Sequence, residues 1–364
     1  MMSDLFENLT IGGETLKAQV ELDDTLKTLS QACDYTFNGE STFIVPSMIP
    51  PSNFKVGLIV GGSGTGKSSL LKHFGEISSH TWSPSKAVAS QVDPTILMKL
   101  GLSSIPSLCR PYHVLSEGEK HRADLASALV NGAQVVDEFT STVHRDLARS
   151  ICIGLRKYID KTDDVQITLA TCHLDVAEWL EPDWIFNTNT GKLTEGRLER
   201  RPIKLEVYPC TTQMWPHFSK HHYLTGEINK AARCWLGVID NIACCFVSSI
   251  PFPRRNLKNG WREHRLVTLP DYQGMGLGVR LSDLIAQHHI NSECRYFAKT
   301  AHDALGKYRE VSNKWRATVT NLVSRKSSYL GSHKRKDLKQ HGAYNSFNWE
   351  AHATRLCYSH EYIG

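Results

Sequence analysis

The sequence predicts an α/β protein with two consecutive units, and two glycine-rich loops and a charge asymmetry support this prediction. Each loop follows an apolar strand-like run and opens a helix-like run: "GLIVGGSGTGKSSLL" at 57–71 and "LPDYQGMGLGVRLSD" at 269–283. Residues 1–200 hold 18 Lys and Arg against 25 Asp and Glu, whereas residues 201–364 hold 24 against 12. We therefore expect two units with different ligands.

Strand-like and helix-like segments alternate in the first half. "KVGLIVGG", "AQVVDEF" and "VQITLATCH" are predicted as buried strands, and "EKHRADLASALVNG" and "DLARSICIGLRKYID" as helices. This alternation predicts a mainly parallel sheet, closed by a hairpin near "NTNTGKLTEG". We expect domains at 1–200 and 201–324, followed by a basic, weakly structured tail at 325–364.

In the second half, "CWLGVIDNIACCFVSSI" predicts a strand–turn–strand with the turn at Asp240-Asn241. Further strands are expected at "HRLVTLP" and "RYFAKTA", and helices at "VRLSDLIAQHHI" and "HDALGKYREVSNKW". The basic surplus of this half favours a polyanionic partner, with DNA first among them. A solvated basic surface or a site for an anionic cofactor are the alternatives.

Composition points to a globular cytoplasmic protein. The chain is 41% hydrophobic and 22% charged, and its ten cysteines form no C-x-x-C pair, so no metal knuckle or disulfide framework is expected. The N-terminus lacks a signal pattern, and no apolar run is long enough to span a membrane. We expect no membrane partner.

The first glycine-rich loop matches G-x-x-x-x-G-K-[ST] between a strand and a helix, which is the context of a P-loop that binds ATP. Its amides would surround the phosphates, Lys67 would reach the β- and γ-phosphates, and Ser68 would ligate Mg²⁺. The predicted ATP-binding residues here are Gly61, Gly62, Ser63, Gly64, Thr65, Gly66, Lys67, Ser68 and Ser69.

Four downstream motifs make this half resemble an ABC-type ATPase: "VASQVD", "LSEGEKHR", "VVDEFTS" and "ITLATCH". The resemblance implies that Ser116 and Gly118 form the signature loop and that Gln91 belongs to the Q-loop. It further implies that Asp137 holds Mg²⁺, that Glu138 polarises the attacking water, and that His173 senses the γ-phosphate. A head-to-tail homodimer is implied as well, of the kind that clamps or senses nucleic acid.

The sequence also departs from the family pattern. Phe139 stands where the family usually has Pro, and His144 stands at the usual Asp of the dimer-contacting loop. Only 47 residues separate Lys67 from Leu115, which leaves little room for the helical arm that transporters use. Transport is therefore not the expected function.

The second glycine-rich loop lacks the third glycine of a dinucleotide fingerprint but fits Q-x-x-G-x-G through Gln273, Gly276 and Gly278. It resembles the acetyl-CoA loop of GNAT-type N-acyltransferases; a simple strand-to-helix turn is the alternative. The implied acyl-CoA-binding residues are Val267, Leu269, Gln273, Gly274, Met275, Gly276, Leu277, Gly278 and Val279, and Arg280 would add a charge. The resemblance implies that amides at 267–269 polarise the thioester carbonyl.

For acid and base roles, the GNAT resemblance implies Tyr308 as the acid that protonates the thiolate, with a core aromatic as the alternative. Among bases we favour His222, then His221, in "HFSKHHYL", with His264 as a weaker candidate. His288 and His289 close a helix and are expected to be structural.

This half is also similar to the Mom-like branch of the superfamily, which modifies bases in phage and mobile-element DNA. Trp261 and Trp315 are candidates for stacking on an extruded base, with core packing as the alternative. Candidate phosphate contacts are Arg254, Arg255, Lys258, Arg262, Lys314, Arg316 and the tail segment Lys334–Lys336.

The sequence therefore predicts an ATP-dependent, nucleic-acid-associated N-acyltransferase that uses acetyl-CoA or another acyl-CoA. A protein or small-molecule N-acetyltransferase regulated by its ATPase domain is one alternative. A non-catalytic, ATP-gated nucleic-acid clamp is the other.

Overall fold

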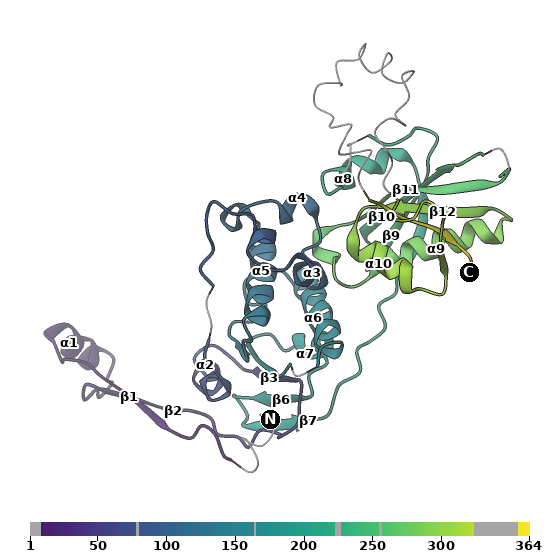
Figure 1. The fold of residues 1–364 in the computed structure, drawn as a ribbon. Helices are drawn as coiled ribbons and strands as arrows, with labels where there is room; N and C mark the ends of the chain where they lie inside the picture. Colours follow the sequence, from purple (N-terminus) through teal and green to yellow (C-terminus); the bar gives the residue numbers. More distant parts are fainter. Residues whose placement is uncertain (1–8, 78–79, 164, 223–226, 255–256, 324–355) are drawn as a thin grey trace. The chain divides into compact units, whose positions relative to one another are not determined.

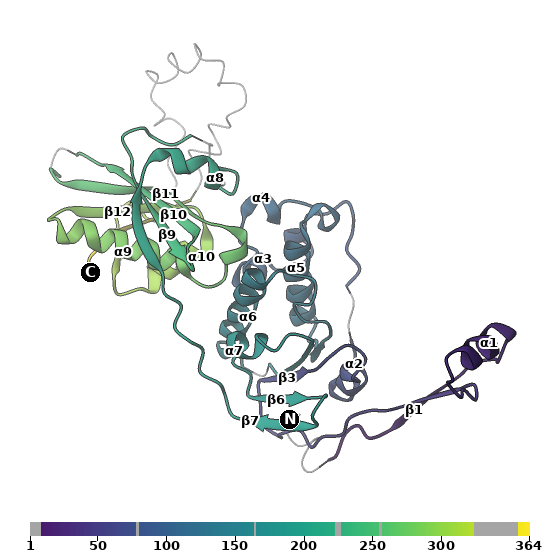
Figure 2. The same cartoon turned by 180° about the vertical axis from the view of Figure 1, so that it is seen from behind.

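The computed structural model describes residues 9–77, 80–163, 165–222, 227–254, 257–323 and 356–364. Within them the chain divides into two compact α/β units, whose main boundary lies between Pro202 and Ile203 (Figures 1 and 2). No described helix combines the length and the apolar character that a membrane span requires.

The first unit contains a five-stranded sheet in the order β4-β5-β3-β6-β7. Its strands are β3 (Val56–Val60), β4 (Val135–Val136), β5 (Ile167–Thr171), β6 (Trp184–Asn187) and β7 (Lys192–Glu195). The first four are parallel, and β7 returns antiparallel to β6, so the predicted parallel sheet and closing hairpin are confirmed.

The helices of this unit are α2 (Lys67–Leu71), α3 (Pro94–Lys99), α4 (Ile105–Leu108), α5 (Glu117–Val130), α6 (Arg145–Asp160) and α7 (Val176–Leu180). A separate two-stranded sheet pairs β1 (Thr15–Gln19) with β2 (Glu40–Ile44), with α1 (Asp24–Ala32) between them in the chain.

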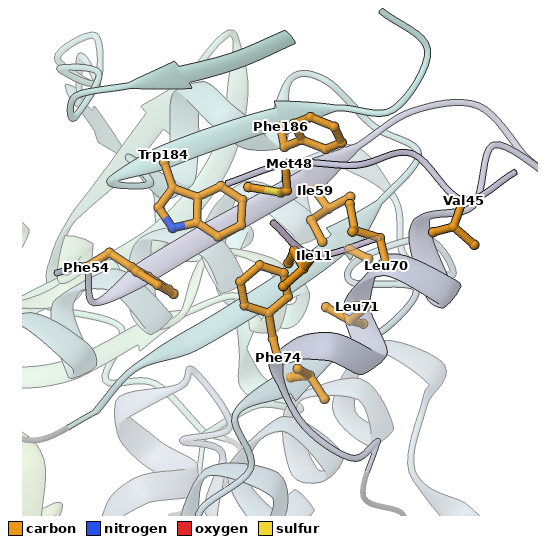
Figure 3. Close-up of a cluster of buried hydrophobic side chains, with 12 residues drawn as sticks. Ile11, Val45, Met48, Phe54, Ile59, Leu70, Leu71, Phe74, Trp184 and Phe186 are labelled. Atoms are coloured by element: carbon orange, nitrogen blue, oxygen red, sulfur yellow. The ribbon is translucent and has the colours of Figure 1, made fainter. Parts of the chain in front are cut away.

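A core of buried side chains fixes α2 to the central strand (Figure 3). Leu70 and Leu71 of α2 pack with Ile59 of β3, and Phe74 stacks on the fully buried Trp184 of β6 at 5.5 Å between ring centroids. These close-packed aromatic and aliphatic contacts hold α2, the helix that follows the first loop, in one position against the sheet.

The second unit is built on one seven-stranded sheet in the order β13-β14-β12-β11-β10-β9-β8. Its strands are β8 (Glu206–Cys210), β9 (Arg233–Ile239), β10 (Ile242–Pro251), β11 (Gly260–Thr268), β12 (Arg295–Thr300), β13 (Trp315–Ala317) and β14 (Tyr358–Tyr362). Helices α8 (Trp215–Ser219), α9 (Leu277–Asn291) and α10 (Asp303–Val311) connect them. Asp240 and Asn241 both have positive φ, as the predicted tight turn between β9 and β10 requires.

The expectation of a weakly structured tail at 325–364 is wrong for the last residues of the chain. Tyr358–Tyr362 forms β14, which pairs antiparallel with β12 on one side and with β13 on the other. A strand with partners on both edges has its backbone groups satisfied by the sheet, and His360 is buried there. The basic segment Lys334–Lys336 lies outside the described residues.

Candidate functional sites

The parallel sheet of the first unit gathers the predicted ATPase residues at one edge. Gly61 follows β3, Asp137 follows β4 and His173 comes two residues after β5, which lies between the other two strands. The carboxyl ends of parallel strands share one edge of a sheet, and ligands of open α/β sheets bind there. Residues from three distant parts of the sequence thus follow three neighbouring strands at the same edge as the first loop.

The loop itself has the backbone of a phosphate cradle. Gly64 and Gly66 have φ of 74° and 88°, and no side chain caps the helix that Gly66 opens. The Nζ atom of Lys67 donates to the carbonyl oxygen of Gly62 at 2.6 Å, so the lysine folds back over the loop. A phosphate group that enters the loop would take over this donor.

Two residues that sequence reasoning missed line the same loop. Thr188 Oγ1 lies 2.6 Å from Thr65 Oγ1, and Asn189 Oδ1 accepts from the Gly62 amide at 3.3 Å. Both follow β6, which is the neighbour of β3 in the sheet. Only the strand order, which no local motif encodes, brings them to the loop.

Phe43 is a third missed residue. A Cβ atom placed on Gly66 would lie 2.9 Å from the Phe43 ring and 2.8 Å from Pro46. The ring therefore lies beside the loop, and about a third of it is exposed (36%). An exposed aromatic face next to a phosphate cradle is suited to stack on a nucleotide base.

At the end of β4, Asp137 and Glu138 occupy a strained turn. Glu138 has φ of +49° and is exposed, while its amide donates to Asp137 Oδ1 at 2.9 Å. Phe139, which replaces the usual Pro, is fully buried and donates its amide to Ala170 on β5. The substitution thus anchors the turn in the core and leaves Glu138 pointing out of it.

The His144 region is tied to the loop that carries His173. Arg145, the next residue, donates through Nε to Asp175 Oδ2 at 2.8 Å, and its guanidinium lies 5.0 Å from the Trp179 ring centroid. His173 itself is half-buried, with its amide bound to Thr171 Oγ1.

The predicted signature loop lies at the start of α5, and its Ser116 donors bind the carboxylate of Glu119 in the same chain. Ser116 caps the helix, and both its amide and its hydroxyl donate to Glu119 Oε2, at 2.9 and 3.0 Å. Ser107 donates to the other carboxylate oxygen at 2.5 Å. Although burial raises the pKa of Glu119, these hydrogen bonds lower it overall, so the carboxylate is the stable form. Gly118 packs against Leu147, where an added Cβ would clash at 2.1 Å.

Gln91 is engaged within its own loop. Its Oε1 accepts from the Ser83 amide at 2.8 Å, and its Nε2 donates to the Lys86 carbonyl at 3.0 Å. The Q-loop role of Gln91 stays a prediction.

The residues at this edge fit ATP with Mg²⁺. Magnesium prefers a few protein oxygens together with phosphate and water oxygens, and the Ser68 hydroxyl and the Asp137 carboxylate are oxygens of that kind. Ser68 is exposed and Asp137 partly exposed. Among the described residues no cluster of three or more His, Cys, Asp or Glu suggests an all-protein metal site instead.

In the second unit, the loop between β11 and α9 has the same form as the first cradle. Gly274 and Gly276 have φ of 88° and 82°, and Gly276 opens α9 without a side-chain cap. Gln273 is buried, and its Nε2 donates to the Thr268 carbonyl at 2.9 Å. A Cβ on Gly278 would lie 2.8 Å from Thr268 Oγ1. The loop is therefore closed against the end of β11, with the amides of the first turn of α9 left for an anion.

Strands β11 and β12 separate next to this loop. They pair only at Gly260–Arg262 with Arg295–Phe297, whereas β11 continues to Thr268 beside β10 and β12 continues to Thr300 beside β14. The Leu269 amide donates to Cys244 on β10, so Leu269 cannot be a donor to a thioester as expected. Amides alternate in an antiparallel ladder, so Val267 also faces β10, and Thr268 faces the opening. Of the three amides expected at 267–269, only that of Thr268 is therefore turned away from β10, and its role as a donor stays a prediction.

Tyr308 is held by an acid. Its hydroxyl donates to Asp283 Oδ2 at 2.6 Å, and Trp315 Nε1 donates to Asp283 Oδ1 at 2.8 Å. Burial first, and then the hydrogen bond to Asp283, raise the pKa of Tyr308, so the phenol keeps its proton at neutral pH. Trp315 is itself buried, which makes base stacking by this residue wrong and core packing right.

The candidate bases differ in their surroundings. The His222 ring lies 5.6 Å from Trp215 of α8, and Trp215 packs in a core cluster with Phe246 and Val267, near the end of β11. Burial, followed by the charges of Arg265 and Arg262, lowers the pKa of His264 to about 4, and its Nε2 accepts from the Asn229 amide at 3.2 Å. The Nε2 acceptor of His264 is therefore already occupied, and the role of His222 as the base stays a prediction. His221 is half-buried beside it, and Tyr223 and Leu224 of the same motif lie outside the described residues.

The two histidines at the end of α9 differ: His289 is buried, whereas His288 is exposed, with its ring 6.0 Å from that of Trp235. His289 is buried between Trp261 and Tyr296, and its Nε2 lies 2.9 Å from Ser249 Oγ. The Arg233 guanidinium lies 4.4 Å from the Trp261 ring centroid. Trp261 is therefore used in packing rather than left free for a base.

The predicted phosphate contacts fall into two groups. Arg316 pairs with Glu361 at 3.0 Å, and Lys314 lies 3.8 Å from Asp283, so their charges are partly compensated. Arg254 and Lys258 are exposed and Arg262 is half-buried, all at the end of the β10–β11 hairpin, whereas Arg255 lies outside the described residues.

The two units thus define a two-domain α/β protein. A mainly parallel sheet with a P-loop motif is followed by a mainly antiparallel sheet, which splits between its parallel strands β11 and β12 next to a glycine cradle. Residues 201–309 match the family model described as Acetyltransferase (GNAT) family, so the chain contains an acetyltransferase domain of this family. No curated protein matches the chain.

Solved structures resemble one or the other half. A GNAT family acetyltransferase from Elizabethkingia anophelis with acetyl-CoA bound is 14% identical, with a TM-score of 0.30 over 44% of this chain and 98% of that one. The ribosomal-protein-S18-alanine N-acetyltransferase from Escherichia coli is 10% identical, with a TM-score of 0.30 over 44% and 93%. A dimeric structure of MJ0796, a bacterial ABC transporter cassette, is 15% identical, with a TM-score of 0.35 over 45% and 94%.

Proposed function

We propose that this protein is an ATP-dependent acetyltransferase that transfers an acyl group from acetyl-CoA, or another acyl-CoA, to an amine of a nucleic acid. The observation that carries this proposal is the uncapped glycine cradle at Gly276 beside the opening between β11 and β12. The cradle suits a pyrophosphate, and the opening suits the pantetheine arm that leads from it.

The transfer needs one base, one donor and one acid. The amine nitrogen forms a bond to the thioester carbonyl carbon while His222 takes the amine proton, and the Thr268 amide binds the carbonyl oxygen as negative charge develops there. The C–S bond then breaks, and Tyr308 gives its proton to the leaving thiolate. Tyr308 must release Asp283 for this step, and Asp283 remains bound to Trp315.

In the first unit, ATP would occupy the loop at 61–68 with Mg²⁺ on Ser68 and Asp137, and Glu138 would orient the attacking water. Closure of two chains would bring Ser116 and Gly118 of one chain to the ATP of the other. ATP binding would thereby clamp a nucleic acid for the transferase. The basic surplus of residues 201–364 supports a nucleic-acid acceptor, with a nucleobase amine as the target.

Radiolabelled acetyl-CoA offered in parallel with DNA, tRNA and a protein extract tests the proposal. We expect ATP-stimulated label in nucleic acid, with DNA labelled most strongly. Label that reaches only protein would contradict the proposed acceptor while keeping the transferase. Absence of transfer to any acceptor, together with DNA-stimulated ATP hydrolysis, would identify a non-catalytic clamp instead.

A further inference from the structure

The end of the β10–β11 hairpin carries two arginines that share one aromatic ring. The guanidinium carbons of Arg254 and Arg262 lie 4.3 and 5.1 Å from the centroid of Phe252. Phe252 in turn packs against Phe297 of β12 at 5.7 Å. Within the described part of the chain, neither guanidinium forms an ion pair or a hydrogen bond.

The backbone holds this hairpin end in a defined shape. The Phe252 amide donates to the Gly260 carbonyl at 2.7 Å, and Arg254 and Leu257 exchange two backbone hydrogen bonds. Leu257 is buried, and a Cβ on Gly260 would lie 2.4 Å from its side chain, so Gly260 is needed for the close approach. Arg254 is therefore held by backbone hydrogen bonds to Leu257, and Arg262 is held by its place on β11.

The electrostatics of the pair are unfavourable without an anion. Burial first, and then the charge of Arg254, lower the pKa of Arg262. Arg295, on the neighbouring strand, offers a contrast: it lies 5.2 Å from the Phe297 ring but pairs with Glu361 at 2.6 Å. Glu361 thus neutralises the arginine stacked on Phe297, whereas the two arginines stacked on Phe252 have no acidic partner among the described residues.

We infer that Arg254 and Arg262 form a docking site for the phosphate groups of duplex DNA, at the opposite end of β11 from the acetyl-CoA cradle. This inference rests on the proposed function, because it specifies how the acceptor is held. The guanidiniums lie over the Phe252 ring, so their N–H edges are offered to phosphate. Contacts of this kind position the nucleic acid without reading its sequence.

Salt-dependent binding of the full-length chain to two short fluorescent duplexes of unrelated sequence tests the site. Each phosphate contact contributes about 0.9 to the slope of log K against log salt. The double variant Arg254→Gln/Arg262→Gln loses two such contacts. We therefore expect its slope to be smaller in magnitude than that of the wild type by about 1.8, equally for both sequences. Arg295→Gln removes one positive charge, from a stack that Glu361 already compensates, and should leave the slope unchanged.

Equal slopes for the wild type and the double variant would overturn the inference, as would an equal loss in Arg295→Gln. Binding to anionic lipid vesicles but not to DNA would overturn it as well. Melting temperature and acetyl-CoA affinity confirm that each variant is folded. If binding depends on the hairpin but no acetyl group reaches DNA, the docking site stands and the proposed function fails. If DNA is acetylated and the double variant binds normally, only the docking site fails.

Discussion

Gly66 and Gly276 have nearly the same backbone conformation, with φ 88° and ψ 12° at Gly66 and φ 82° and ψ 18° at Gly276. Each opens a helix that no side chain caps, in a different unit of the chain. L-residues disfavour this left-handed region, so both loops need glycine at this position. Two unrelated loop sequences thus reach the same backbone conformation at the start of a helix.

Gly276→Asp should weaken acetyl-CoA binding about tenfold or more while ATP binding is retained. The new side chain is strained by the positive φ and places a negative charge where the pyrophosphate would lie. Gly191→Asp is the matched control, because Gly191 has φ of 64° in open space in the other unit. Isothermal titration with each ligand measures both effects, and a loss of ATP binding in Gly276→Asp would contradict two separate sites.

Lys67→Met should weaken ATP binding by about 10- to 100-fold, because a hydrogen bond to a charged group is worth about 1.5–3 kcal/mol. Lys72→Met, in the exposed turn directly after α2, removes the same charge without touching the loop and should bind ATP normally. Equal losses in the two variants would mean that general charge, and not the Lys67 position at the Gly62 carbonyl, governs affinity.

Glu119→Gln should raise ATP turnover about fivefold, as expected for removing about 1 kcal/mol of repulsion at a helix N-terminus. The carboxylate now occupies the Ser116 donors that the signature loop would offer to the partner's phosphate. Glu117→Gln is the control: Glu117 carries the same charge but pairs with Lys120. ATP-dependent dimerisation, followed by sedimentation, should increase in parallel. Slower turnover in Glu119→Gln would contradict this role.

Tyr308→Phe should lower kcat for acetyl transfer about 100-fold, the lower end for a lost general acid. Because the pKa of Tyr308 is raised, we expect the rate not to fall with rising pH until beyond the ordinary tyrosine pKa of about 10. Asp283→Asn keeps the phenol and removes its acceptor, and it should affect kcat less. A lower melting temperature with unchanged kcat would mean that Tyr308 only packs the core.

The second unit should lose stability as the pH falls from about 6.5 to about 4. Burial is the first cause that lowers the pKa of His264 and of His289 to about 4, whereas an unfolded histidine titrates near 6.5. As the pH falls, the unfolded state therefore binds protons before the folded state does. The stability that the two neutral histidines contribute is complete only above about pH 6.5. Calorimetry of the full chain measures this loss of stability. The transition of the second unit is the one whose melting temperature rises when acetyl-CoA is added. His289→Asn should flatten the profile; an unchanged profile would contradict the assignment.

Spacing within one short segment was sufficient to predict both cradles and the strands before them. Thr188, Asn189 and Phe43 could not be predicted, because they reach the P-loop only through strand order and packing. To single out the Thr268 amide, one must know which residues of β11 point their amides toward β10. That alternation depends on the strand register, which the bulge at Ser248/Ser249 alters. β14 was hidden because a five-residue strand after a basic segment becomes recognisable only through its partners β12 and β13.

Isothermal titration of one sample with both ligands tests the central claim most directly. We expect acetyl-CoA to bind one site per chain with the same stoichiometry before and after saturation with ATP and Mg²⁺, since each ligand has its own cradle. Competitive displacement of acetyl-CoA by ATP would show a single shared site and would contradict the account.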